Sequence, residues 1–274
     1  MGLARRRITA AVGVAMQVPG ATGADAACRV VVEDSPRRVR VFFGDVAVAD
    51  SRRVKLLFES DHLPVYYFPL EDLRQDLLVP SAHTTHCPHK GEARYWSIRA
   101  GDRLVRDAIW NYPAPINSCP DIRGLAAFYW DRADAWFEED EEVFVHPRDP
   151  YHRVDVLESS RHVRVLVGGE VVADTHRPRL LFETNLPTRY YIPMLDVRRE
   201  ALQPSLTKTR CPYKGVASYW SVGGGGETHR DIAWAYQAPI AESAKIAGLV
   251  CFYNEKVELI VDGEPQPRPT TKWS

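Results

Sequence analysis

Two short turns place a thiol close to an amine, a combination that could support covalent chemistry. The run Cys-Pro-His-Lys-Gly at residues 87–91 recurs as Cys-Pro-Tyr-Lys-Gly at residues 211–215. A proline three residues before a glycine favours a tight turn, which would bring the cysteine and the lysine together. Because a neighbouring ammonium group stabilises a thiolate, Cys87 and Cys211 are candidate nucleophiles.

The lysine of each turn and one glutamate complete the set of candidate catalytic groups. Lys90 and Lys214 could bind an anion or, if desolvated, form a Schiff base with a carbonyl compound. Glu59 and Glu183 end apolar runs, where a carboxylate serves either as a lysine partner or as a general acid or base. The structural alternative is a small buried cysteine beneath a turn whose lysine pairs with Glu59.

Histidines surround the turn of the first repeat only. His83, His86 and His89 flank Cys87, and an extended strand would place His83 and Cys87 on one face, with donor atoms suited to zinc. The second repeat has no histidine at the matching positions, whereas a metal required by the fold would be expected in both copies. We therefore expect no metal and solvent-facing or ligand-facing histidines. If one copy does chemistry, we expect it to be the first.

Aromatic residues recur in both repeats and are candidates for lining a ligand cleft. Large aromatics in small β domains mostly fill the core, but neighbours on a strand point to opposite faces, so one of each pair could line a cleft. Besides the three histidines, the candidate ligand-binding residues are Tyr67, Trp96, Trp110, Tyr112, Tyr191, Trp220 and Trp234.

These motifs recur because the chain contains an internal duplication. The run Leu-Leu-Phe-Glu at 56–59 returns at 180–183, and Tyr-Trp-Ser at 95–97 returns at 219–221 with the same offset. Solenoid repeats are shorter, roughly 20–50 residues, so this repeat indicates two whole domains.

Each copy is expected to be mainly β. Residues 38–43 and 46–50 alternate around Gly44-Asp45, which predicts a hairpin. Residues 69–78 open with a proline and space their leucines helically, and residues 117–123 precede Gly124, so both are predicted as short helices. Further strands are expected at 55–60, 65–68, 93–99, 107–112 and 125–130. The fold class is a tandem pair of compact antiparallel β domains with five to seven strands and one or two short helices each.

The expected organisation is a leader at 1–30, a first domain at 31–145, a linker at 146–157, a second domain at 158–263 and a tail at 264–274. The leader combines three arginines with a short apolar stretch, and we expect it to be disordered, with an export signal as the alternative. Acidic and then proline-rich composition between the copies is typical of a linker, although Trp136 and Phe137 predict that part of it packs as a closing strand.

Bulk composition excludes several classes of protein. The formal net charge is −1, and no basic stripe marks a nucleic-acid interface. No run of 18 apolar residues exists, so we expect no membrane-spanning helix. Five cysteines at irregular spacing favour reduced thiols and a cytoplasmic location.

The combined motifs resemble the domain of unknown function 427 family. They are Leu-Leu-Phe-Glu, Tyr-Tyr-x-Pro, Thr-x-Cys-Pro-x-Lys-Gly, Tyr-Trp-Ser and Gly-Leu-x-x-Phe-Tyr, all present twice between residues 39 and 263. The resemblance implies a β-tent-like fold, as in methionine sulfoxide reductase B and the ligand-binding domain of cereblon. Those relatives hold zinc with two Cys-x-x-Cys pairs, which this chain lacks, so we expect neither zinc nor another cofactor. The family has also been labelled nucleotidyltransferase-like, but no Asp-x-Asp pair for Mg²⁺ and no P-loop lysine occur, so that activity is not expected.

The residues together predict a protein that binds or transforms a small organic molecule in an aromatic-lined cleft at the Cys-Pro-x-Lys-Gly turn. The alternative is a non-catalytic ligand-binding or scaffold module. Whether the protein is an enzyme stays open at this point, and so does its oligomeric state, for which an internal pseudo-dimer of the two copies is one arrangement.

Overall fold

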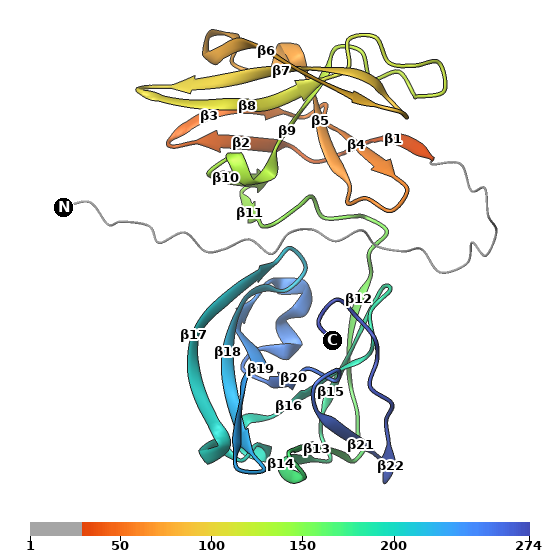
Figure 1. Cartoon of the computed structure of the whole chain (residues 1–274), viewed down its shortest axis with the longest axis vertical. Helices are drawn as coiled ribbons and strands as arrows, with labels where there is room; N and C mark the ends of the chain where they lie inside the picture. Colours follow the sequence, from red (N-terminus) through yellow and green to blue (C-terminus); the bar gives the residue numbers. More distant parts are fainter. Residues whose placement is uncertain (1–28) are drawn as a thin grey trace. The chain divides into compact units, whose positions relative to one another are not determined.

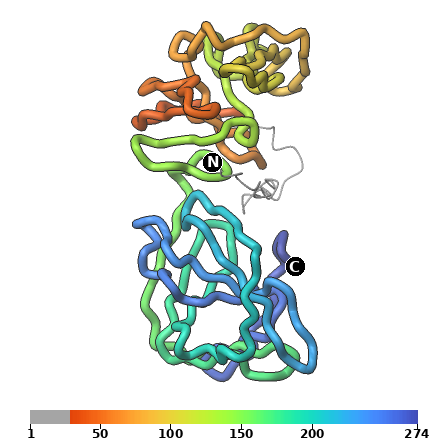
Figure 2. Tube along the Cα trace, turned by 90° about the vertical axis from the view of Figure 1, so that its left-hand side faces the viewer, coloured from red at the N-terminus to blue at the C-terminus, as the bar shows by residue number. Residues whose placement is uncertain are grey.

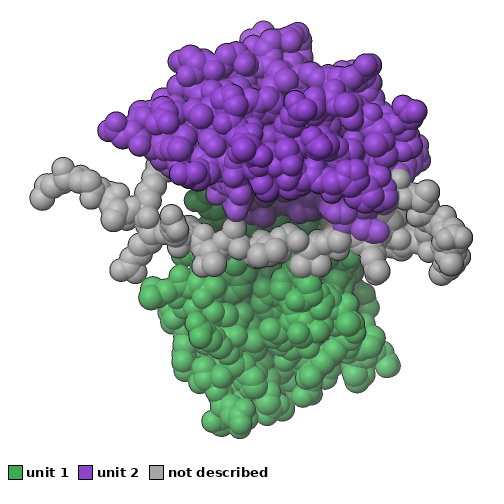
Figure 3. Space-filling model, turned by 45° about the horizontal axis from the view of Figure 1, so that its top comes forward, with its two compact units in different colours: residues 1–14, 150–274 green, residues 15–149 purple. Residues whose placement is uncertain are grey.

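The computed structural model describes residues 29–274, which divide into two compact units, drawn in different colours in Figure 3. Copy one denotes residues 29–149 and copy two denotes residues 150–274. Residues 1–28, which hold nearly all of the expected leader, lie outside the described part of the chain.

Copy one is built from two antiparallel sheets (Figure 1). The larger sheet has seven strands in the order β1-β4-β5-β9-β8-β7-β6, and the smaller has four in the order β11-β10-β2-β3. The strands are β1 Val30–Asp34, β2 Val39–Phe43, β3 Val46–Ser51, β4 Lys55–Glu59, β5 Val65–Pro69, β6 Leu78–Cys87, β7 Gly91–Ala100, β8 Arg103–Asn111, β9 Leu125–Phe128, β10 Ala135–Glu138 and β11 Glu141–Val143.

Copy two repeats this topology strand for strand, with sheets ordered β12-β15-β16-β20-β19-β18-β17 and β14-β13-β21-β22. Its strands are β12 Val154–Glu158, β13 Val163–Val167, β14 Glu170–Thr175, β15 Arg179–Glu183, β16 Arg189–Ile192, β17 Leu202–Cys211, β18 Gly215–Gly224, β19 Glu227–Pro239, β20 Val250–Phe252, β21 Glu258–Val261 and β22 Glu264–Pro265.

The predicted fold class is confirmed: the chain is mainly β, with four antiparallel sheets in two similar halves. The hairpin across Gly44 forms between β2 and β3, and Trp136 lies in a closing strand, β10, that pairs with β2. The predicted number of strands was too low, because short edge strands such as β1 and β11 carry no clear alternation of apolar residues.

The predicted helices are shorter than expected or absent. Residues 69–78 form two single turns of 3₁₀ helix, η1 Leu70–Asp72 and η2 Gln75–Leu77, with η4 Met194–Asp196 and η5 Arg199–Ala201 as their counterparts. The predicted helix at 117–123 is wrong for copy one, whereas copy two forms η6 Ala241–Ile246 at this place. Copy one has Pro120 where copy two has Ala244, and proline disfavours helical backbone in the preceding residue and removes an N–H donor.

The remaining helical turn is η3 Trp130–Arg132 in copy one. No helix among the described residues has the length and apolar character needed to cross a membrane.

Each large sheet buries both of its faces. Tyr66 packs into the cluster between the two sheets, with Val41, Phe68 and Ile109, whereas Tyr67 packs into a second cluster on the opposite face. This alternation of neighbouring residues on β5 is the one expected for a strand. Copy two has the same two clusters. The second cluster lies beneath the Cys-Pro-x-Lys-Gly turn and therefore positions it.

Two turns of copy two approach each other very closely. A methyl group at Gly224 would lie 2.3 Å from the carbonyl oxygen of Val167, and one at Gly168 would lie 2.7 Å from backbone atoms of Gly224. In copy one the counterpart of Gly168, Gly44, has open space around it. The glycine run at 223–226 thus serves backbone packing in copy two.

Candidate functional site

The Cys-Pro-x-Lys-Gly turn of copy one joins β6 to β7 and directs its lysine inward. The N–H of Lys90 donates to the carbonyl of Cys87 at 3.3 Å, and Gly91 adopts a φ of 105°, with the carbonyl of Ala114 close by. Glycine is suited to this position, because other residues rarely adopt such a φ and a side chain would crowd that carbonyl. The Lys90 ammonium donates to Glu59 on β4, and the two side chains are only 8% and 12% exposed.

Copy two contains the same ion pair and adds a histidine. The Lys214 ammonium lies 2.5 Å from Glu183, whose other carboxylate oxygen accepts a hydrogen bond from the His152 ring at 3.0 Å. The His152 ring in turn stacks on Tyr213, with 4.1 Å between ring centres. Burial by itself would raise the pKa of Glu183, but Lys214 and His152 outweigh it and lower the pKa to about 2.

The cysteines of the described chain are free, and burial makes those with perturbed pKa values harder to ionise. Burial raises the pKa of Cys211, against the opposing effect of Lys214, and burial also raises the pKa of Cys119. The pKa of Cys251 rises to about 12 for the same reason. The lysine beside Cys211 therefore does not produce a thiolate near neutral pH.

The three histidines of the first repeat lie at the surface. His83, His86 and His89 are exposed, and the ring of His83 packs on Tyr95 with 4.5 Å between centres. A register shift lies between Pro80 and Thr84 on β6, yet His83 and Thr85 both contact Tyr95, a member of the second cluster against which Cys87 packs. Within the described residues these side chains do not gather into a three-ligand group.

The predicted ligand-binding aromatics occupy different surroundings. Tyr67 is buried and accepts a hydrogen bond from the Trp110 indole at 3.2 Å; Tyr191 and Trp234 form the same pair at 3.3 Å. Tyr112 is buried in the second cluster, whereas Trp96 and Trp220 pack against the clusters between the sheets. Of the predicted ligand-binding residues, only Trp110 lines the cavity described next.

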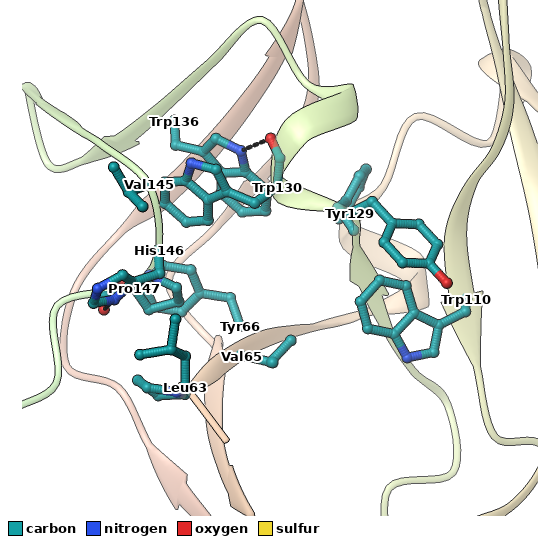
Figure 4. Close-up of a pocket in the computed structure, with 12 residues that line it drawn as sticks. Leu63, Val65, Tyr66, Trp110, Tyr129, Trp130, Trp136, Val145, His146 and Pro147 are labelled. Atoms are coloured by element: carbon teal, nitrogen blue, oxygen red, sulfur yellow. Dashed lines mark hydrogen bonds between the residues drawn. The ribbon is translucent and has the colours of Figure 1, made fainter. Parts of the chain in front are cut away.

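Copy one contains a cavity of about 180 Å³ between two aromatic walls (Figure 4). One wall is Trp130 stacked on Trp136, with ring centres 4.3 Å apart and planes within 4°; the other is Trp110 against Tyr129, with centres 4.6 Å apart. The complete lining is Leu63, Pro64, Val65, Tyr66, Trp110, Phe128, Tyr129, Trp130, Trp136, Val145, His146 and Pro147.

The rim of this cavity has an unusual backbone. Val145 adopts a φ of 71°, in the left-handed region that β-branched residues rarely enter. The next residue, His146, donates its N–H to the carbonyl of Phe144 at 2.8 Å, and its ring Nδ1 lies 2.7 Å from the carbonyl oxygen of Pro147. Strain of this kind costs on the order of 1–3 kcal/mol and persists only where the surroundings impose it.

In copy two an arginine lies beside the matching Trp–Tyr pair. Arg189 takes the place of Val65, and its guanidinium lies 5.7 Å from the ring centre of Trp234 and 5.8 Å from that of Tyr253. Two hydrogen bonds of 2.7 Å tie this guanidinium to Glu255, which is fully buried.

The C-terminal residues complete this arrangement. The ring centre of Trp273 lies 5.4 Å from the same guanidinium, and Thr271 donates to Glu255 at 2.5 Å. Figure 2 shows the end of the chain, in dark blue, beside the strands of copy two. In copy two, protein side chains thus pack on the Trp–Tyr pair. The matching pair of copy one faces an open cavity.

A family model described as domain of unknown function (DUF427) matches residues 31–139 and, a second time, residues 155–263. The chain belongs to the DUF427 family. The predicted resemblance, including its tandem form, is thereby confirmed. No curated protein matches the chain.

Both DUF427 matches stop short of chain segments that lie beside the Trp–Tyr pairs. The first ends at residue 139, before Val145, His146 and Pro147 at the cavity rim. The second ends at residue 263, before Trp273. The family core therefore supplies the Trp–Tyr pair and, in copy two, also Arg189, while chain segments outside it add Val145, His146 and Pro147 in copy one and Trp273 in copy two.

The sequence interpretation missed most of the cavity lining. The sequence pattern predicts a closing strand around Trp136 and a linker at His146, and neither pattern indicates that these residues lie beside Trp110. Tyr66 and Tyr129 recur in both repeats, and this recurrence is the sequence signal that could have indicated them as cavity-lining residues. The sequence did not show which face of each strand stays open.

Proposed function

We propose that copy one binds a small planar organic molecule in its aromatic cavity and that copy two has lost this capacity. The contrast between the copies supports the proposal: Trp110 and Tyr129 face an open cavity, whereas Trp234 and Tyr253 contact Arg189. Burial of aromatic surface next to a few polar groups is the usual basis of small-molecule recognition.

The size and charge of the cavity define the ligand class. A volume of about 180 Å³ is close to the roughly 150 Å³ of an apolar cavity that accepts benzene, so one ring with small substituents fits. The Arg132 guanidinium already lies 4.4 Å from the ring centre of Tyr129, which disfavours a second cation at this ring. A neutral aromatic such as phenol or indole is therefore preferred, with His146 among the residues of the lining that carry polar atoms.

Binding is favoured over catalysis at the turn. Lys90 and Lys214 both use their ammonium groups to hold a glutamate, and burial raises the pKa of Cys211. These contacts support a structural role for the turn, which fastens β4 beneath the β6–β7 hairpin. Fast alkylation of Cys87 near neutral pH would instead favour the enzymatic alternative.

The test measures phenol and indole binding to the full chain by calorimetry and tryptophan fluorescence. Val65→Met extends a side chain into the cavity without adding charge, and we expect it to weaken binding at least tenfold. Cys87→Ser and Lys90→Met serve as controls at the turn and should leave the affinity unchanged. Wild-type affinity in Val65→Met, or loss of binding in Cys87→Ser, would refute the cavity as the site.

We also infer a cytoplasmic location. Cys87, Cys119, Cys211 and Cys251 are all free thiols, which supports a reducing compartment. Detection of the native protein in the exported fraction of its cells would contradict this inference.

A further inference from the structure

A second cluster of polar side chains lies in copy two, at the end of the β13–β14 ladder. His162 directly precedes β13, and His176 directly follows β14. Because Val163 pairs with Thr175, the two histidines lie opposite each other. The alternation of side chains along β14 places Asp174 on the same face as His176.

The three side chains already converge. The Nε2 atom of His162 lies 2.8 Å from a carboxylate oxygen of Asp174, and the two imidazole rings stack with 4.1 Å between centres and 13° between planes. One donor atom from each of the three residues lies within 4.8 Å of the others. The side chains of His162 and Asp174 are 33% and 52% exposed, so an ion from solvent can reach them.

The neighbouring charges are arranged around this cluster without occupying it. Asp262 accepts from the backbone N–H of His162 at 2.9 Å and pairs with Arg161 at 2.7 Å, which fixes the strand that carries His162. Arg164 lies opposite Asp174 in the ladder and contributes a positive charge, which reduces the affinity for a cation.

Copy one has arginines where copy two has these histidines. Arg38 and Arg52 take the places of His162 and His176, and Asp50, the counterpart of Asp174, forms a two-point ion pair with Arg38. A guanidinium balances the carboxylate but cannot ligate a metal, whereas a neutral imidazole can. Copy one therefore has an ion pair at this place, whereas copy two, with histidine at both positions, has three side chains that can ligate a metal.

We propose that His162, Asp174 and His176 form a binding site for a divalent transition-metal ion of the zinc class. Two imidazole nitrogens and a carboxylate oxygen suit Zn²⁺, and three protein ligands leave a position for water. A tetrahedral zinc ion with bonds of about 2.0–2.1 Å holds its ligand atoms roughly 3.3 Å apart, whereas the donor atoms here lie within 4.8 Å of one another. The stacked imidazole rings must turn out of their parallel arrangement to direct a nitrogen at the ion, and their position at the surface gives them room to do so.

The test uses the full chain without an affinity tag and Zn²⁺ alone, measured by calorimetry, with Co²⁺ absorption as a report of geometry. We expect one ion per chain, bound with a dissociation constant in the micromolar range. The double variant His162→Arg with His176→Arg restores the arginine pattern of copy one, which keeps the strands compatible, and should weaken binding at least tenfold.

The reverse exchange, from arginine to histidine in copy one, tests whether the same residues create a new Zn²⁺ site. Arg38→His combined with Arg52→His in copy one should create a second Zn²⁺ equivalent. Cys87→Ser combined with Cys211→Ser should leave the first equivalent intact. The proposal is overturned if the wild type binds no Zn²⁺ below 1 mM, if the arginine double variant binds as the wild type does, or if the cysteine double variant loses the ion.

Discussion

Replacing Glu183 by glutamine is expected to remove much of the acid sensitivity of copy two. Burial would raise the pKa of Glu183, but Lys214 and His152 lower it to about 2, below its ordinary value of 4.5. A carboxyl group whose pKa is lowered by folding contributes stability that is fully present above its unfolded pKa and is lost as the pH falls through the folded pKa. The affected window therefore runs from about pH 5 down to pH 2.

The size of this effect follows from the pKa difference. Each pKa unit corresponds to about 1.36 kcal/mol, so the interval between 4.5 and about 2 gives about 3 kcal/mol. The Glu183 side chain is only 6% exposed, and solvent screens the pair little. This is a large share of the roughly 5–15 kcal/mol that stabilises a typical domain.

The assay is urea unfolding of the full chain at pH 7 and pH 3, read by pulsed hydrogen exchange in peptides from β15 and β18. Because pH 3 still lies above the folded pKa of about 2, part of the stabilisation remains there, and we expect the wild type to lose about 2 kcal/mol more than Glu183→Gln between these pH values. Glutamine leaves Lys214 buried without its charged partner, so Glu183→Gln with Lys214→Met serves as a second variant in which both charges are gone.

A surface pair supplies the control for this experiment. Asp121 and Arg123 lie 2.7 Å apart, but both are exposed to solvent and salt, which weaken their interaction. Asp121→Asn should therefore leave the acid response unchanged. If the wild type and both Glu183 variants lose the same free energy between pH 7 and pH 3, the reasoning about the buried carboxylate is wrong.

Three further predictions concern packing and thiol reactivity. Trp136→Ala should cost about 3–5 kcal/mol in urea unfolding, because the side chain is 3% exposed in the core of copy one; a loss below 1 kcal/mol would contradict this. Cys251, with its pKa raised to about 12, should react with iodoacetamide at pH 8 only after unfolding, as mass spectrometry of native and urea-treated protein would show. Gly224→Ala should lower the melting temperature because its methyl group would meet the carbonyl of Val167, whereas Gly223→Ala, with 3.8 Å to its nearest neighbour, should not; equal melting temperatures would refute the close contact.

The features that repeat in the sequence were predictable from it. Both copies keep the lysine turn and the glutamate, so the pairing of Lys90 with Glu59 could be anticipated as the structural alternative, and the structure contains it. The closing strand around Trp136 followed from its apolar residues. These predictions succeeded because they depend on local periodicity or on residues present twice.

The features that differ between the copies were not predictable from local patterns. The predicted helix at 117–123 does not form in copy one, which has Pro120 at a position where the matching helix of copy two has another residue. Arg189 lies far in sequence from Glu255 and Trp273, and only the folded chain shows that they meet in front of Trp234. Cavity shape depends on such distant contacts.

The contact between Gly168 and Gly224 has a genetic consequence. The position of Gly224 corresponds to Ala100 in copy one, where the nearby turn leaves Gly44 with open space. A recombination event that replaced only the segment around Gly224 by its counterpart from the first copy, with Val167 left in place, would bring in that alanine and force its methyl group onto the carbonyl of Val167. Transfer in the opposite direction meets no such barrier, so the duplicated halves can exchange this segment in one direction only.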